Sequence, residues 1–286
     1  MQKNRRRPKG LLCVQCVLIT AMMAGGLMDQ APADAGAANQ ALLNAIPGDA
    51  TAFLAIRSLR EFDRDIQAIS TQIGFPLGAE GMFPAPLEMV KMQLGMTEGL
   101  QENGGAALVL LNARQVENVE ALPDRMVLYL PSADPKALLT AMGAQESADG
   151  MYTLNLGGAP SVATTRESFA LIAKAPDAPG ETASAALTEA ASARGEGVIA
   201  AMTDDRVAKY ARQDVVLWIN MRNISPALRQ EITEGLRDFF AELSGGFGTT
   251  QPAQGEEAVQ QVDKILTQSE ELSLAILVDQ QVGLDI

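Results

Sequence analysis

The pattern of apolar and polar residues indicates a buried strand at 215–219, where Val215-Val-Leu-Trp-Ile219 runs without a polar residue. β-Branched and aromatic residues dominate this run, which is typical of a strand buried on both faces of a sheet. A helix pattern follows, and the same order of strand and helix occurs at 50–73. Asp49, Leu54, Arg57 and Leu59 in the first stretch match Asp214, Ile219, Arg222 and Ile224 in the second. The chain therefore predicts two copies of one supersecondary unit.

Capping signals mark where helices of the first copy begin. Ser58 precedes apolar residues at steps of three and four, and Glu61 completes a capping box. Asp134 followed by Pro135 is an N-cap with proline at the first helical position. The periodicity predicts helices at 40–46, 58–73, 87–94 and 135–142, a loop at 74–86, strands at 50–56, 106–111 and 125–130, and a meander of strands at 151–156, 161–165 and 169–174.

The second copy follows a stretch rich in Ala, Pro, Gly and Ser, which is typical of a linker and carries a short helix pattern at about 182–193. Thr203-Asp204-Asp205 caps the next helix, and a strand covers 215–221. Ser225-Pro226 opens the longest helix, whose apolar stripe is Leu228, Ile232, Leu236, Phe239, Phe240 and Leu243. A glycine-rich loop at 245–255, a helix around 259–266 and a strand at 272–278 complete the copy.

These elements predict an α+β fold, in which two pseudo-repeats of strand-helix-helix-strand form antiparallel sheets with packed helices. The segments are a signal peptide at 1–37, the first repeat with its β-meander at 38–176, an Ala/Pro/Gly-rich linker at 177–197 and a second, shorter repeat at 198–286. The second copy stops soon after 272–278, so its sheet is expected to lack strands. Either the meander covers it, or two chains pair edge to edge, or the chain is truncated.

The first residues have the order of an export signal. Basic residues at 3–9 precede an uncharged, mostly apolar stretch at 11–28, and small residues follow at 31–37. An uncleaved anchor remains the alternative, because the apolar stretch is about as long as a minimal membrane span. Cleavage would remove Cys13 and Cys16, the chain's two cysteines. An export signal without disulfides favours a bacterial envelope protein that is periplasmic or secreted.

Composition and charge limit the classes of partner that the chain is expected to bind. Apolar residues make up 47% of the chain and charged residues 20%, which is typical of a folded protein. The net charge of −13 becomes −16 when residues 1–37 are removed. Such an acidic chain is not expected to bind nucleic acid or anionic lipid through charge, and it equally fits a well solvated exported surface.

Three stretches resemble a known family. They are Ile-Pro-Gly-Asp-Ala-Thr-Ala-Phe-Leu-Ala-Ile-Arg-Ser-Leu at 46–59, Arg-Met-Val-Leu-Tyr-Leu-Pro at 125–131 and Ser-Phe-Ala-Leu-Ile-Ala-Lys-Ala-Pro at 168–176. With the export signal, they are similar to a planctomycete-type family of exported bacterial proteins of unknown function. The likeness covers nearly the whole chain after the signal, but its motifs are structural. It implies no activity, cofactor or site residue.

The sequence offers little catalytic chemistry. It contains no histidine, which excludes Ser-His-Asp catalysis, histidine general bases and nearly every zinc site. No phosphate loop, dinucleotide-binding glycine motif or EF-hand loop occurs. A carboxylate pair remains possible, and Asp204-Asp205 is the one doublet that suggests it. An acidic first helical turn explains that doublet better. We therefore name no catalytic, cofactor-binding or metal-binding residue.

Other singled-out residues have structural explanations. Asp49 and Asp214 each precede a strand and are expected to fix a turn. Arg57 and Arg222 are expected to pair with acidic side chains rather than bind a ligand. Trp218 is expected to pack in the core. The methionines Met82, Met89, Met92 and Met96 form either an adaptable apolar surface or, more ordinarily, part of a core helix.

The functional expectation follows from these exclusions. The sequence favours an exported, non-catalytic envelope protein that acts by binding or structural association, with an unknown envelope protein or polymer as partner and no cofactor. It would be anchored in a membrane only if the N-terminal segment stays uncleaved. The alternative is a carboxylate-dependent hydrolase of envelope carbohydrate or peptide. A cleft with exposed Asp and Glu would favour the enzyme, whereas an apolar groove or open sheet edge would favour the binder.

Overall fold

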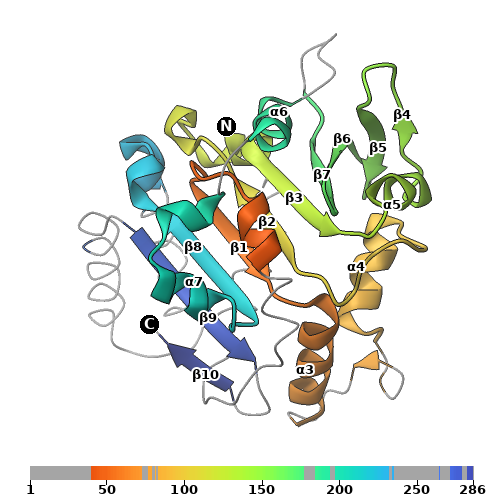
Figure 1. Ribbon diagram of the computed structural model, residues 1–286, viewed down its shortest axis with the longest axis horizontal. Coiled ribbons are helices and arrows are strands. Elements are labelled where there is room, and N and C mark those ends of the chain that lie inside the picture. Colours follow the sequence, from red (N-terminus) through yellow and green to blue (C-terminus); the bar gives the residue numbers. More distant parts are fainter. Residues whose placement is uncertain are drawn as a thin grey trace, which may run out of the picture.

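The strands that the structure describes pair antiparallel in one sheet of ten, in the order β10-β9-β8-β1-β2-β3-β7-β6-β5-β4 (Figure 1). The computed structural model describes residues 40–72, 77–78, 81, 83–176, 184–193, 197–231, 234, 264, 271–278 and 282–285. The strands are β1 (Ala52–Ile56), β2 (Ala106–Leu110), β3 (Met126–Pro131), β4 (Gln145–Glu146), β5 (Tyr152–Leu156), β6 (Ala159–Arg166), β7 (Phe169–Lys174), β8 (Val215–Asn220), β9 (Glu271–Val278) and β10 (Val282–Asp285).

Helices pack on both faces of this sheet, which confirms the predicted α+β class. The α-helices are α3 (Leu59–Gln72), α4 (Pro86–Leu94), α5 (Pro135–Ala141), α6 (Ala185–Ser192) and α7 (Asp204–Tyr210). Short 3₁₀ helices are η2 (Ala113–Gln115), η3 (Val119–Arg125), η4 (Val198–Ala201) and η5 (Met221–Asn223). Residues 40–45 and 226–231 are also helical.

Local hydrogen bonds explain where these helices start. Ser58 Oγ accepts from the Glu61 N–H at 3.3 Å, as the capping box predicts. Asp134 accepts from the N–H of Ala137 at 3.1 Å, and Pro135 occupies the first turn. Ser225 Oγ accepts from the N–H of Leu228 at 3.1 Å, at the start of helix 226–231. The chemistry of these caps is contained in four or five neighbouring residues, so the sequence could predict it.

The two predicted copies share one sheet instead of forming one each. Their first strands, β1 and β8, pair at its centre, with Phe53 directly opposite Trp218. The two rings stack with centroids 5.5 Å apart, and both side chains are about 1% exposed. The repeat alignment makes Phe53 and Trp218 equivalent, so this pairing is what a two-fold arrangement of the copies would produce. The repeat itself stays a prediction, because most of the helix after β8 lies outside the described residues.

The two faces of the sheet are covered to different extents. One face carries Phe53, Tyr129, Val216 and Trp218, which are buried beneath helix 40–45, α6, η4 and α7. On the other face, Leu130 and Ile172 are buried with α5, whereas Leu54 and Leu217 are half-buried. Of the strand predicted to be buried on both faces, Val215 is 8% exposed on this second face and Leu217 and Ile219 are half-buried, so the described chain buries the second face less fully than the first.

The end of the chain also differs from expectation. No strand was predicted after 278, yet Val282–Asp285 forms β10 and pairs with β9. The linker region contains α6, close to the helix predicted at 182–193. The predictions for the signal peptide at 1–37, the loop at 245–255 and the helix around 259–266 lie outside the described residues, apart from Lys264.

Candidate functional site

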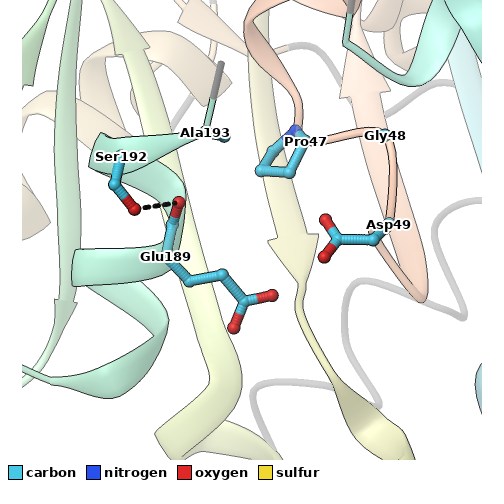
Figure 2. A pocket seen from close by; sticks show the side chains of 6 residues that line it. All are labelled: Pro47, Gly48, Asp49, Glu189, Ser192 and Ala193. Atoms are coloured by element: carbon cyan, nitrogen blue, oxygen red, sulfur yellow. Dashed lines mark hydrogen bonds between the residues drawn. The ribbon is translucent and has the colours of Figure 1, made fainter. Parts of the chain in front are cut away.

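A polar pocket of about 430 Å³ lies between the turn that precedes β1 and the end of α6 (Figure 2). Asp49 comes from the turn and Glu189 from the helix, and Figure 2 shows both carboxylates directed into the space between them. Pro47, Gly48, Ser192 and Ala193 complete the lining. The pocket thus brings together two carboxylates that are far apart in the sequence.

The two carboxylates have different surroundings. Partial burial raises the pKa of the Glu189 carboxyl, the negative charge of Asp49 raises it further, and Arg125 opposes the shift. Asp49 is exposed to solvent. Ser192 Oγ donates to the carbonyl oxygens of Thr188 at 2.7 Å and Glu189 at 3.3 Å, so this hydroxyl is engaged by its own helix. Two carboxyl groups in different surroundings at one pocket are an arrangement from which acid–base chemistry can be built.

Sequence reasoning did not find this pocket. It assigned Asp49 to a turn, and Asp49 does lie in the turn before β1. It gave no role to Glu189, because a single glutamate on a short helix carries no local signal. Only the packing of α6 on the sheet places the two carboxylates at one pocket.

A buried ion pair joins the two halves of the sheet. Arg57 Nη2 donates to Asp214 Oδ1 at 2.6 Å, and their side chains are 6% and 4% exposed. The backbone N–H of Arg57 donates to the Asp214 carbonyl oxygen at 2.9 Å, and Nη2 also lies 3.0 Å from Glu61 Oε2. The predicted pairing of Arg57 with acidic side chains is therefore confirmed. Asp214 was expected to fix a turn before its strand; the structure adds that its carboxylate holds Arg57.

The remaining candidates lie apart from the pocket lining. Asp204 and Asp205 are exposed in the first turn of α7, as the structural explanation of that doublet predicts. Arg222 is exposed, and its carbonyl oxygen accepts from Arg114 Nε at 3.2 Å; its pairing with an acidic side chain stays a prediction. Trp218 packs in the core, as predicted.

The methionine-rich stretch divides between core and surface. Met96 is 6% exposed and packs with α5 and the meander strands, whereas Met92 is 64% exposed on α4. Phe83 and Val90 are 46% and 41% exposed. Within the described part of the chain, these three side chains are the large apolar ones that face solvent most, and they fall within ten residues of sequence. We call Phe83, Val90 and Met92 the α4 surface.

The half-buried face of the sheet carries a continuous row of leucines. Leu274 pairs with Leu217, Leu217 with Leu54, Leu54 with Leu108 and Leu108 with Leu128, so the row crosses five neighbouring strands. All five are half-buried. We call these residues the leucine row.

The described ranges were also compared with the requirements of a metal site and of a membrane-spanning helix. There, no three or more side chains of the metal-ligating types come together. Among the helices that the structure describes, none is both long and apolar enough to cross a membrane.

Comparisons with known proteins add little. No family model and no curated protein matches the chain. Two solved structures are similar, crystal forms IV and I of TP0453, with TM-scores of 0.34 and 0.33 and sequence identities of 10% and 9%. Each alignment covers 62% of this chain, and 63% and 62% of the two structures, so the chain matches less than two thirds of their length. Similarity at this level does not show a shared fold.

Proposed function

We propose that the protein is exported and acts without catalysis, by binding or structural association in the bacterial cell envelope. The observation that carries this proposal is the α4 surface, where Phe83, Val90 and Met92 are 46%, 41% and 64% exposed. Large apolar side chains gathered on a short exposed segment are typical of surfaces that contact another macromolecule. Methionine suits such a surface, because its unbranched thioether adapts to partners of different shape.

Export is supported by the order of basic, apolar and small residues at 1–37. We expect the mature chain, periplasmic or secreted, to begin between Asp34 and Asn39. N-terminal sequencing of the protein from its native host tests this expectation. Recovery of an intact Met1 chain in membranes would instead make it an anchored protein.

The partner is expected to be an envelope protein or polymer, and the α4 surface is expected to bind it. Immobilised wild-type protein is incubated with the native envelope fraction, and the bound material is compared with that of Met92→Glu. The matched control is Gln93→Glu, which adds the same charge at a neighbouring exposed position of α4. We expect Met92→Glu to lose the bound component and Gln93→Glu to keep it. Equal capture by all three proteins would reject the α4 surface.

A second candidate function is favoured by the pocket. Glu189 has a raised pKa and Asp49 is solvated, so they could act as acid and base in hydrolysis of envelope carbohydrate or peptide. Wild-type protein, Glu189→Gln and Asp49→Asn are assayed on fragments of cell-wall glycan and peptide. Turnover by the wild type that both substitutions abolish would support the hydrolase. No turnover by the wild type, or turnover that survives both substitutions, would reject it.

A further inference from the structure

The described chain leaves two members of the leucine row incompletely packed. Leu54, in the middle of the row, and Leu274, at one end, pack with Phe62 and Ile69 of α3 around Val215. Leu128, at the other end, packs with the cluster that contains α5. Within the described residues, Leu108 and Leu217 belong to none of the four packed clusters. The two positions on either side of Leu54 are thus half-buried and the least packed of the row.

A second helix begins on the same face of the sheet, next to the half-buried leucines. Leu228, in helix 226–231, is 1% exposed and packs near Leu110, Ile219 and Leu272. Those three residues have the same strand parity as the leucine row, so they lie on the same side of the sheet. Helix 226–231 therefore enters the face from the opposite end to α3.

The chain after this helix carries a matching apolar stripe. Neighbouring antiparallel strands need only a two-residue connection, yet β8 and β9 are separated by residues 221–270. In that connection the stripe of Leu228 continues at the helical spacing through Ile232, Leu236, Phe239 and Leu243. We propose that the leucine row is the docking surface for the chain's own residues 232–243.

The spacing of the apolar residues along the helix matches the spacing of the leucines along the strand. One step of four residues along a helix advances about 6 Å, which takes the stripe from Leu228 to Ile232. Two residues along a strand span about 7 Å, which separates Leu110, beside Leu228, from Leu108 in the row. The next stripe residue, Ile232, thus reaches the level of Leu108 and Leu217. None of the residues of the α4 surface takes part in this docking, so the inference is independent of the proposed function.

A thiol at Leu108, one of the two least packed positions of the row, reports whether the segment docks. The reporter is the full-length chain with Cys13→Ser, Cys16→Ser and Leu108→Cys, and the measurement is its rate of reaction with a maleimide under native conditions. We expect slow reaction in this chain and reaction at least about tenfold faster after Ile232→Asp or Phe239→Asp, because local opening exposes the thiol. The matched control is Ala241→Asp, which puts the same charge on the other side of the helical stripe and is expected to leave the rate unchanged.

Trp218 fluorescence, which reports the opposite sheet face, shows whether each variant is folded. If the aspartate variants unfold, single cysteines at Leu236→Cys, Phe239→Cys and Ala241→Cys replace them. The first two are then expected to react at least about tenfold more slowly than the third. Equal rates at these positions, or an unchanged Leu108→Cys rate in a folded Ile232→Asp chain, would overturn the proposal. Protection that disappears on dilution would also overturn it, by assigning the row to a second copy of the chain.

Discussion

The buried pair of Arg57 and Asp214 predicts a strong energetic coupling between the two halves of the sheet. Their side chains are 6% and 4% exposed and meet at 2.6 Å. Removing one partner of a buried ion pair costs about 3–5 kcal/mol, because the other charge stays in the protein without compensation. Arg57→Met should destabilise the fold by about this amount. Asp214→Asn should cost less, because Glu61 Oε2, whose side chain is 24% exposed, stays 3.0 Å from the guanidinium.

A double-mutant cycle measures the coupling. The double variant removes both charges, so its free energy of unfolding should fall by about 2–3 kcal/mol less than the sum of the single losses. The control cycle uses Arg60 and Glu102, which meet at 2.7 Å but are 62% and 26% exposed. An exposed pair of this kind contributes only about 0.2–1 kcal/mol. Urea unfolding followed by Trp218 fluorescence gives all the values. A coupling for the buried pair no larger than that of the exposed pair would refute the reasoning.

Three further predictions concern burial and pH. Trp218→Ala should lower the free energy of unfolding by about 3–5 kcal/mol, because its side chain is 1% exposed; an unchanged free energy in urea unfolding would contradict its burial in the core. Hydrogen bonds from Lys91 and Arg60 lower the pKa of Glu102 in the folded protein. Its contribution to the free energy of unfolding is therefore fully present above the unfolded pKa of about 4.3 and is lost as pH falls through the folded pKa. Glu102→Gln should therefore be less stable than wild type at pH 7, and the difference should vanish in acid. Glu189 has a raised pKa, which penalises its ionised form in the folded state, so Glu189→Gln should be the more stable protein at pH 7, with a gap that narrows as pH falls. No narrowing would show that Glu189 does not titrate as its surroundings require.

The elements that the sequence predicted well are those with local causes. Ser58, Asp134 and Ser225 cap helices where their hydroxyl or carboxylate reaches an N–H three residues on. The strand patterns at 50–56 and 215–221 likewise became β1 and β8, trimmed by one or two residues. Such features depend on neighbours in the chain, and the sequence lists those neighbours in order.

The sequence alone therefore determined the α+β class, most of the helices and strands, the burial of Trp218 and the tendency of Arg57 to seek an acidic partner. Only the tertiary structure decided that β1 pairs with β8 in one sheet, that the partner is Asp214, and that Asp49 meets Glu189 at a pocket. It also decided that Trp218 is buried more fully than Leu217 on the other face of the same strand. Burial of an apolar side chain is favourable wherever it lies in the chain. How fully it is buried depends on which distant segment packs over it, and the local pattern carries no information about that segment.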